Sequence, residues 1–170
     1  MAYDAFMWLT GGNPDAKGES TDKTYASKNA FEIYSFSWGA SNPVTIGSST
    51  SGTGGGKVSI SSFNIMKKTD AASPALFLNC AKGQHFTNAT VNLRKAGGSA
   101  LLYLEYTFTE VFVESIQWSG SAGGDDTPSE SVSFAFGQVD IKYTPQKADG
   151  TAGTPLPASW DLRQNIGQSS

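Results

Sequence analysis

Apolar and polar residues alternate with a period of two along most of the chain, which predicts a mainly β protein. Two of the alternating segments, residues 3–9 and 31–38, are dense in aromatic residues and apolar on both faces. A single sheet with one wet face needs one apolar face, whereas a barrel filled inside and covered outside by a partner needs two. The pattern therefore predicts a small closed or strongly curved antiparallel β-barrel.

Two strands change the face on which their apolar residues lie. The change from even to odd positions falls at Ser61-Ser62 and again at Gly137, and each change predicts a bulge or kink that bends the strand. Further strands are predicted over residues 89–93, 102–108 and 112–118, with turn residues between the predicted strands. Two kinked strands favour a closed or strongly curved sheet.

One segment departs from this period and predicts a single short α-helix over about residues 70–82. Asp70 or Ser73 supplies an N-terminal cap, and Pro74 suits a first helical turn. Gly83 suits the left-handed residue that follows a last turn. The predicted apolar face of the helix consists of Leu76, Phe77 and Cys80.

The length of 170 residues predicts one domain over residues 1–170. Two parts of it lack strand periodicity: a glycine- and serine-rich extended loop at residues 46–57, and a Gly/Pro/Ala-rich C-terminal tail at residues 145–170. Trp160 lies near the end of this tail, and a large apolar ring there predicts that the tail docks onto another surface.

Charge and cysteine content narrow the possible partners and compartments. A formal net charge of −3 argues against a broad basic surface for nucleic acid or anionic lipid. The single cysteine, Cys80, excludes an intrachain disulfide and fits folding in a reducing compartment. The first residues lack a basic region and a cleavage site, and no apolar run approaches the ~20 residues of a membrane span. We therefore expect neither an N-terminal secretory signal nor membrane insertion.

The stretch SSTSGTGGGK, residues 48–57, resembles a phosphate-binding loop at first sight. A P-loop needs a glycine five residues before Gly56, a Ser or Thr after Lys57, and a helix behind it. Here Ser51 and Val58 occupy those two positions, and a strand pattern follows. The stretch is therefore interpreted as an exposed flexible loop without a nucleotide.

Other candidate chemistry is sparse. His85 is the only histidine, and it lies in no nucleophile motif; with one cysteine, the usual zinc sites are excluded. Asp125-Asp126 and Glu130 form an acidic cluster whose spacing does not fit a calcium loop, so a solvated hairpin tip is the better interpretation. The sequence thus predicts no enzyme, no cofactor and no metal site, although a small hydrolase using His85 and Asp125-Asp126 stays open as an alternative.

Stretches matching one known family run in order from near the N-terminus into the tail: Gly18–Ser20, Ile33–Gly39, Val58–Asp70, Ser73-Pro74, Leu76-Phe77, Leu93–Lys95, Val132–Phe136, Ile141–Pro145 and Trp160-Asp161. Together they cover nearly the whole chain. They resemble the haemolysin-coregulated protein (Hcp) family, the tube-forming subunit of bacterial type VI secretion systems.

This resemblance implies a β-barrel with one helix that assembles as a homohexameric ring, with rings stacked into a tube. It implies as partners other copies of the chain, the VgrG spike protein, the contractile sheath and baseplate, and small secreted effectors in the lumen. It also implies a protein that is cytoplasmic before firing and is then secreted without a signal peptide. Within that picture, our hypothesis assigns ring stacking to Ser51, Gly52, Thr53, Gly54, Gly55, Lys57, Trp160 and Asp161.

A function of another class also fits the composition. A monomeric β-sandwich could bind carbohydrate or another ligand through exposed Trp and Tyr residues. Surplus apolar strand faces, by contrast, imply burial against partners. The mass in solution distinguishes them.

Overall fold

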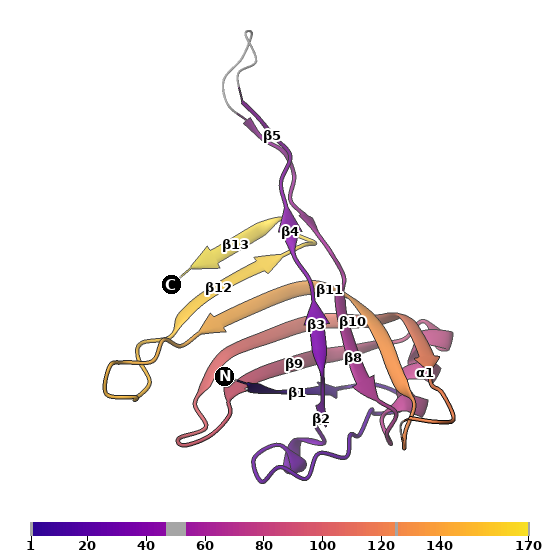
Figure 1. Cartoon of the computed structure of the whole chain (residues 1–170). Helices are drawn as coiled ribbons and strands as arrows, with labels where there is room; N and C mark the ends of the chain where they lie inside the picture. Colours follow the sequence, from indigo (N-terminus) through magenta and orange to yellow (C-terminus); the bar gives the residue numbers. More distant parts are fainter. Residues whose placement is uncertain (1, 47–53, 125, 170) are drawn as a thin grey trace.

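One large antiparallel sheet dominates the computed structural model, which describes residues 2–46, 54–124 and 126–169 (Figure 1). The hydrogen-bonded order is β13-β12-β11-β10-β9-β1-β2. These strands are β1 (Tyr3–Thr10), β2 (Phe31–Glu32), β9 (His85–Lys95), β10 (Leu102–Ser119), β11 (Ser129–Tyr143), β12 (Leu156–Asp161) and β13 (Ile166–Ser169). Two more strands join at the side of β11: β8 (Phe63–Lys68) pairs with β11, and β3 (Ser35–Ser37) pairs with β8.

The segment from β2 to β3 links the two ends of this curved sheet. The backbone N–H of Ile33 donates to the carbonyl of Ala5 in β1 at 3.0 Å, and the N–H of Tyr34 donates to the carbonyl of Met66 in β8 at 2.8 Å. The strand ladders of the described residues nevertheless form no closed sheet. A mainly β fold with one helix is therefore confirmed, whereas the predicted closure into a barrel is not.

A kink line crosses the three central strands at Thr87, Glu110 and Gly137, which lie opposite one another in the ladders of β9, β10 and β11. On either side of it the buried positions change parity, from Phe134 and Phe136 to Val139 in β11. Glu110 adopts a left-handed backbone with φ 56°. A Cβ at Gly137 would lie 3.0 Å from its carboxylate, so the glycine leaves room for that side chain. The parity change predicted at Gly137 is confirmed.

The change predicted at Ser61-Ser62 is also present. Ser37 pairs with Asn64 in the sheet, and Ala40 pairs with Ile60 beyond it. Two residues on one strand therefore face three on the other, which is the residue count of a β-bulge. From this point the chain leaves the sheet as a narrow two-stranded ribbon: β4 (Ala40–Ser41) pairs with β7 (Ser59–Ile60), and β5 (Val44–Thr45) pairs with β6 (Gly54–Gly55) (Figure 1).

The helix α1 spans Ser73–Lys82, close to the predicted range, and packs against β10. The Asp70 carboxylate accepts the N–H of Ala72, Ser73 Oγ accepts the N–H of Asp70, and Gly83 ends the helix with φ 65°. The predicted apolar face is partly wrong. Leu76 is fully buried but Phe77, one residue and about 100° further round the helix, is half exposed.

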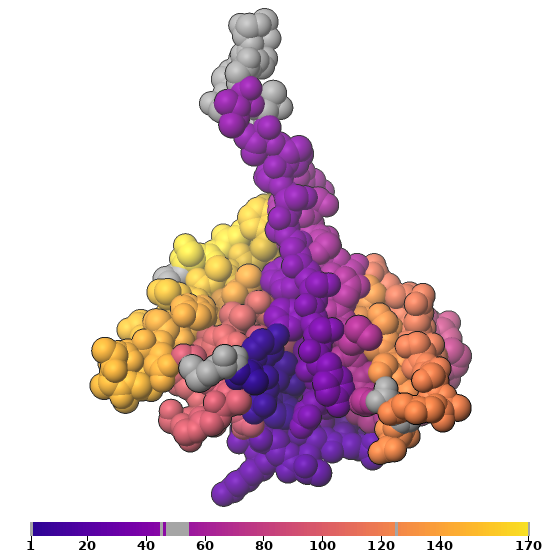
Figure 2. Space-filling view, in the orientation of Figure 1, coloured from indigo at the N-terminus to yellow at the C-terminus, as the bar shows by residue number. Residues whose placement is uncertain are grey.

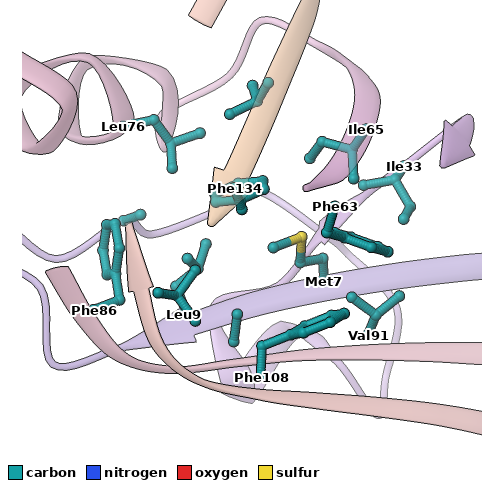
Figure 3. Close-up of a cluster of buried hydrophobic side chains, with 14 of the residues drawn as sticks. Met7, Leu9, Ile33, Phe63, Ile65, Leu76, Phe86, Val91, Phe108 and Phe134 are labelled. Atoms are coloured by element: carbon teal, nitrogen blue, oxygen red, sulfur yellow. The ribbon is translucent and has the colours of Figure 1, made fainter. Parts of the chain in front are cut away.

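Aromatic and aliphatic side chains from both ends of the sequence fill the space enclosed by the sheet (Figure 3). Phe63 from β8 lies 4.8 Å from Phe108 of β10, measured between ring centroids, and Phe108 lies 4.6 Å from Phe136 of β11. Leu76 of α1 joins the same cluster. The helix therefore covers one side of this core.

The outer face of β1 is covered by the chain itself, which corrects the expectation that a partner covers it. The Phe6 ring stacks on Tyr25 at 4.1 Å, and both side chains are 2% exposed. Tyr25 precedes the short 3-10 helix η1 (Ala26–Lys28). Arg94 lies over the Phe6 ring at 5.1 Å and pairs with Asp22 at 2.7 Å. A cation and an aromatic stack therefore bury the surface that the periodicity left unexplained.

Candidate assembly surface

Residues 40–46 and 54–60 form an arm that projects away from the sheet (Figures 1 and 2). Its strands pair only with each other, so the described part of the arm has no other strand beside it. Ile46 is 82% exposed and Val44 is 57% exposed. An isolated two-stranded ribbon is marginally stable at best in water.

Local chemistry explains how the two strands of the arm come together. The N–H of Gly56 donates to the carbonyl of Pro43 at 2.9 Å, and a Cβ at Gly56 would lie 2.6 Å from the Pro43 ring. At the base, the N–H of Gly39 donates to Ser61 Oγ at 2.8 Å. Gly56, the last residue of the glycine run, therefore allows the two strands to approach each other closely. The interpretation of the run as a flexible loop does not include this role.

The predicted stacking residues divide between two elements. Ser51, Gly52 and Thr53 lie outside the described residues. Gly54 and Gly55 form β6, and Lys57 follows it with an exposed side chain. In sequence, Lys57 is the only charged residue of the arm, whose other residues are mostly Gly, Ser and Thr with a few aliphatic side chains.

Trp160 and Asp161 lie at the end of β12, in the hairpin that β12 forms with β13. The Trp160 ring packs partly against the core, which confirms that the tail docks. The Asp161 carboxylate accepts hydrogen bonds from the N–H of Gln164 at 3.0 Å and of Arg163 at 2.8 Å, and these, with the Arg163 guanidinium, lower its pKa. Asp161 thus shapes the turn between the two strands.

This tail hairpin is the main element that the sequence pattern missed. Its exposed apolar residues are Leu156 and Ile166, while Arg163 in its turn pairs with Glu110 of the kink line at 2.6 Å. Gly167 lies directly beneath the Trp160 ring, where a Cβ would come within 2.7 Å. In the sequence, the glycine content of the tail favours an irregular structure. In the hairpin, Gly167 instead leaves the space that the Trp160 indole occupies.

A surface pocket of about 400 Å³ lies at the other end of the strand that leads into the arm. Its chemistry is set by two tyrosines and two carboxylates, Tyr3, Tyr34, Asp4 and Glu32, with Ala2, Ala5 and Ile33 beside them. Tyr34 is 64% exposed. Asp4 pairs with Arg94 at 3.1 Å, whereas Glu32 is exposed and forms no ion pair within the described residues. We call this the basal pocket.

A buried ion pair ties α1 to the sheet. Lys67 of β8 is 1% exposed, and its Nζ lies 2.9 Å from Glu130 and 2.7 Å from Asp70. Glu130, fully buried, also accepts the indole N–H of Trp118 at 2.7 Å. The prediction of Glu130 in a solvated acidic tip is wrong, because the side chain is fully buried and pairs with Lys67, 63 residues away in sequence.

The second exposed aromatic group lies beside this pair. The Phe77 and Trp118 rings are 6.1 Å apart, and both side chains are close to half exposed.

Among residues 2–46, 54–124 and 126–169, no group of three or more His, Cys, Asp or Glu side chains could hold a metal ion. Within the same residues, no helix has the length and hydrophobicity of a membrane span.

Solved structures of type VI secretion proteins share this fold. One, described as a type six secretion system protein, superposes with a TM-score of 0.89 at 34% identity and covers 98% of this chain and all of its own. Hcp1 from Salmonella typhimurium gives a TM-score of 0.78 at 32% identity, covering 99% of this chain and 100% of its own. The architecture is thus that of a type VI secretion protein.

Sequence similarity specifies the family. The family model described as "Type VI secretion system effector, Hcp" matches residues 6–143. Protein hcp1 from Pseudomonas aeruginosa is 40% identical over 169 residues, covering 98% of this chain and 99% of its own. The chain belongs to the Hcp family of type VI secretion proteins, as the resemblance predicted.

Proposed function

We propose that this chain is the structural subunit of a type VI secretion tube. Copies assemble into hexameric rings, and the rings stack into a tube that is expelled and carries or protects effectors. The observation that carries the proposal is similarity to Protein hcp1 over nearly the full length of both chains. The exposed arm supports it, because an unsupported ribbon is the element that contact between copies would bury.

Two kinds of contact meet the needs of such an assembly. A heterologous contact that closes gives a ring, and a second one along the ring axis gives an open-ended stack. The arm extends beyond the sheet and suits the second kind, together with the stacking residues Gly54, Gly55 and Lys57. Trp160 and Asp161 fix the tail hairpin, and through it they shape the rest of the stacking surface.

The remaining partners follow from the same function. The tube would end at the VgrG spike, run inside the contractile sheath above the baseplate, and hold small effectors in its lumen. The protein would be cytoplasmic before firing and secreted by the type VI system afterwards. No enzymatic step is proposed, and His85 stands at the start of β9 with its ring 5.2 Å from Phe112.

Light scattering with negative-stain images tests the proposal. A ring of six chains has a mass of about 107 kDa, six times the 17.9 kDa of one chain. Rings at that mass would support the proposal. A monodisperse monomer without rings at high concentration would reject it in favour of the alternative, a ligand- or carbohydrate-binding module.

Shortening the arm separates ring formation from stacking. Deletion of residues 48–56 should leave rings of six chains, since closure entropy varies slowly with loop length, and should weaken stacking. Intact tubes from this variant would show that the arm has no part in stacking. A collapsed ring would show that the arm belongs to the ring contact instead.

A further inference from the structure

We propose that the arm of one copy inserts into the basal pocket of the next copy along the tube. This inference rests on the proposed function and names the receiving surface, which no similarity to a relative supplies. The committed occupant of the pocket is therefore a second copy of this chain. Three features carry it: the positions of arm and pocket, their apolar surfaces and their charges.

The first feature is that the arm and the pocket lie at opposite ends of one continuous strand path. The pocket residue Tyr34 immediately precedes β3, and the chain then runs through β4 and β5 to Ile46 (Figure 1). At the rise of an extended strand, these twelve steps span about 40 Å. An arm therefore cannot reach the pocket of its own chain, whereas a copy displaced along the ribbon direction presents its pocket to the arm.

The second feature is matched apolar surface. Val44 and Ile46 expose aliphatic side chains on the arm, and Tyr3 and Tyr34 expose rings at the pocket. The pocket holds about 400 Å³, enough for one or two aliphatic side chains of an inserted arm. Contact would remove both sets from water and stabilise a ribbon that has no packed face.

The third feature is complementary charge. The arm carries Lys57 as its single charge, and the pocket carries the carboxylates of Asp4 and Glu32. Glu32 has no ion-pair partner within the described part of its own chain, so it is the better partner for Lys57. Opposite charges that face each other across a contact set its register and exclude wrong pairings.

A charge exchange between Lys57 and Glu32 tests the contact. Lys57→Glu and Glu32→Lys should each raise the protein concentration needed for tubes about tenfold, because six copies of one contact act together at each ring junction. The double variant should return to within about threefold of the unchanged protein. Lys17→Glu, at an exposed lysine outside both surfaces, is the matched control. Loss in both single variants without recovery in the double one would overturn the pairing.

Disulfide trapping gives a second measurement that does not depend on charge. In a Cys80→Ser background, Ile46→Cys and Tyr34→Cys placed in one chain are too far apart to join within it. Under oxidation they should give a ladder of covalent multimers on a non-reducing gel. Cross-linking of Ile46→Cys with Tyr143→Cys, and not with Tyr34→Cys, would overturn the assignment of the pocket.

Ring mass distinguishes the two levels of failure. Rings and tubes that form without Lys57–Glu32 coupling and without the Ile46–Tyr34 cross-link would reject this inference and keep the proposed function. A chain that forms no rings at all would reject both. Cross-linked multimers from ring-forming protein would support both.

Discussion

The buried pair of Lys67 and Glu130 should be the most sensitive polar contact in the fold. Lys67 Nζ has four oxygen neighbours within 3.2 Å, from Lys68, Asp70, Ser73 and Glu130. Lys67→Met removes the charge and leaves the fully buried Glu130 carboxylate with Trp118 as its one remaining donor among the described residues. Breaking such a pair costs about 3–5 kcal/mol, because a buried charge loses its partner.

For a chain of this length, that loss corresponds to a fall in Tm of about 6–20 °C. Urea unfolding followed by tryptophan fluorescence measures the loss in the free energy of unfolding. The measurement is made at several protein concentrations, because assembly adds to apparent stability. Lys67→Met with Glu130→Leu removes both charges and should cost less than Lys67→Met alone. Lys17→Met, at an exposed lysine, should change stability by less than about 0.5 kcal/mol. A loss below about 1 kcal/mol for Lys67→Met would refute this account of the pair.

Three smaller contacts give further tests. The Arg94 guanidinium lowers the pKa of Asp22 below its usual 3.8, so the stability that it adds is full above that value and is lost as the pH falls through the lower one. Asp22→Asn should therefore lower the Tm at pH 7 more than at pH 2, and equal losses would contradict this. Gly167→Ala should push on the Trp160 ring at a cost of about 1–3 kcal/mol and speed amide exchange in residues 156–169; unchanged exchange would mean that the ring has room to move. Arg163→Ala should speed exchange in the same hairpin, and an effect confined to Glu110 would show that the hairpin does not depend on this ion pair.

Local sequence rules predicted those parts of the fold that depend on neighbouring residues. The helix limits follow from Pro74 in the first turn and Gly83 after the last, whose effects act within one turn. The predicted cap at Asp70 or Ser73 is wrong, because Ala72 is the N-cap residue and makes no side-chain cap hydrogen bond. The kinks at Ser61-Ser62 and Gly137 follow from a parity that can be counted along one strand. The helix face failed at Phe77, because the direction in which a short helix meets the sheet is set by residues far away in sequence.

The parts that sequence reasoning missed are contacts between distant segments. In the sequence, Glu130 is one more acidic residue near Asp126. Its ion pair with Lys67 forms only because β8 lies beside β11 in the fold. The cover over Phe6 comes from Tyr25, in a segment with no regular period. The sequence could locate the arm, because Gly and Ser dominate that stretch. It could not locate the basal pocket. That pocket arises where strand ends meet, and its residues carry no common motif.

The kink line makes each central strand two half-strands joined out of phase. In β10, core positions fall on Phe108 before the line and on Val111 and Val113 after it, with Glu110 between them. Deleting Glu110 would place Phe108, Val111 and Val113 at strictly alternating positions, but it would shift one half of β10 by one residue against β9 and β11, a larger change than any substitution there. Substitutions should therefore be tolerated least at even-numbered positions before Glu110 and at the odd-numbered Val111 and Val113 after it, and an alignment gap placed at Glu110 would misassign these two inward-facing residues.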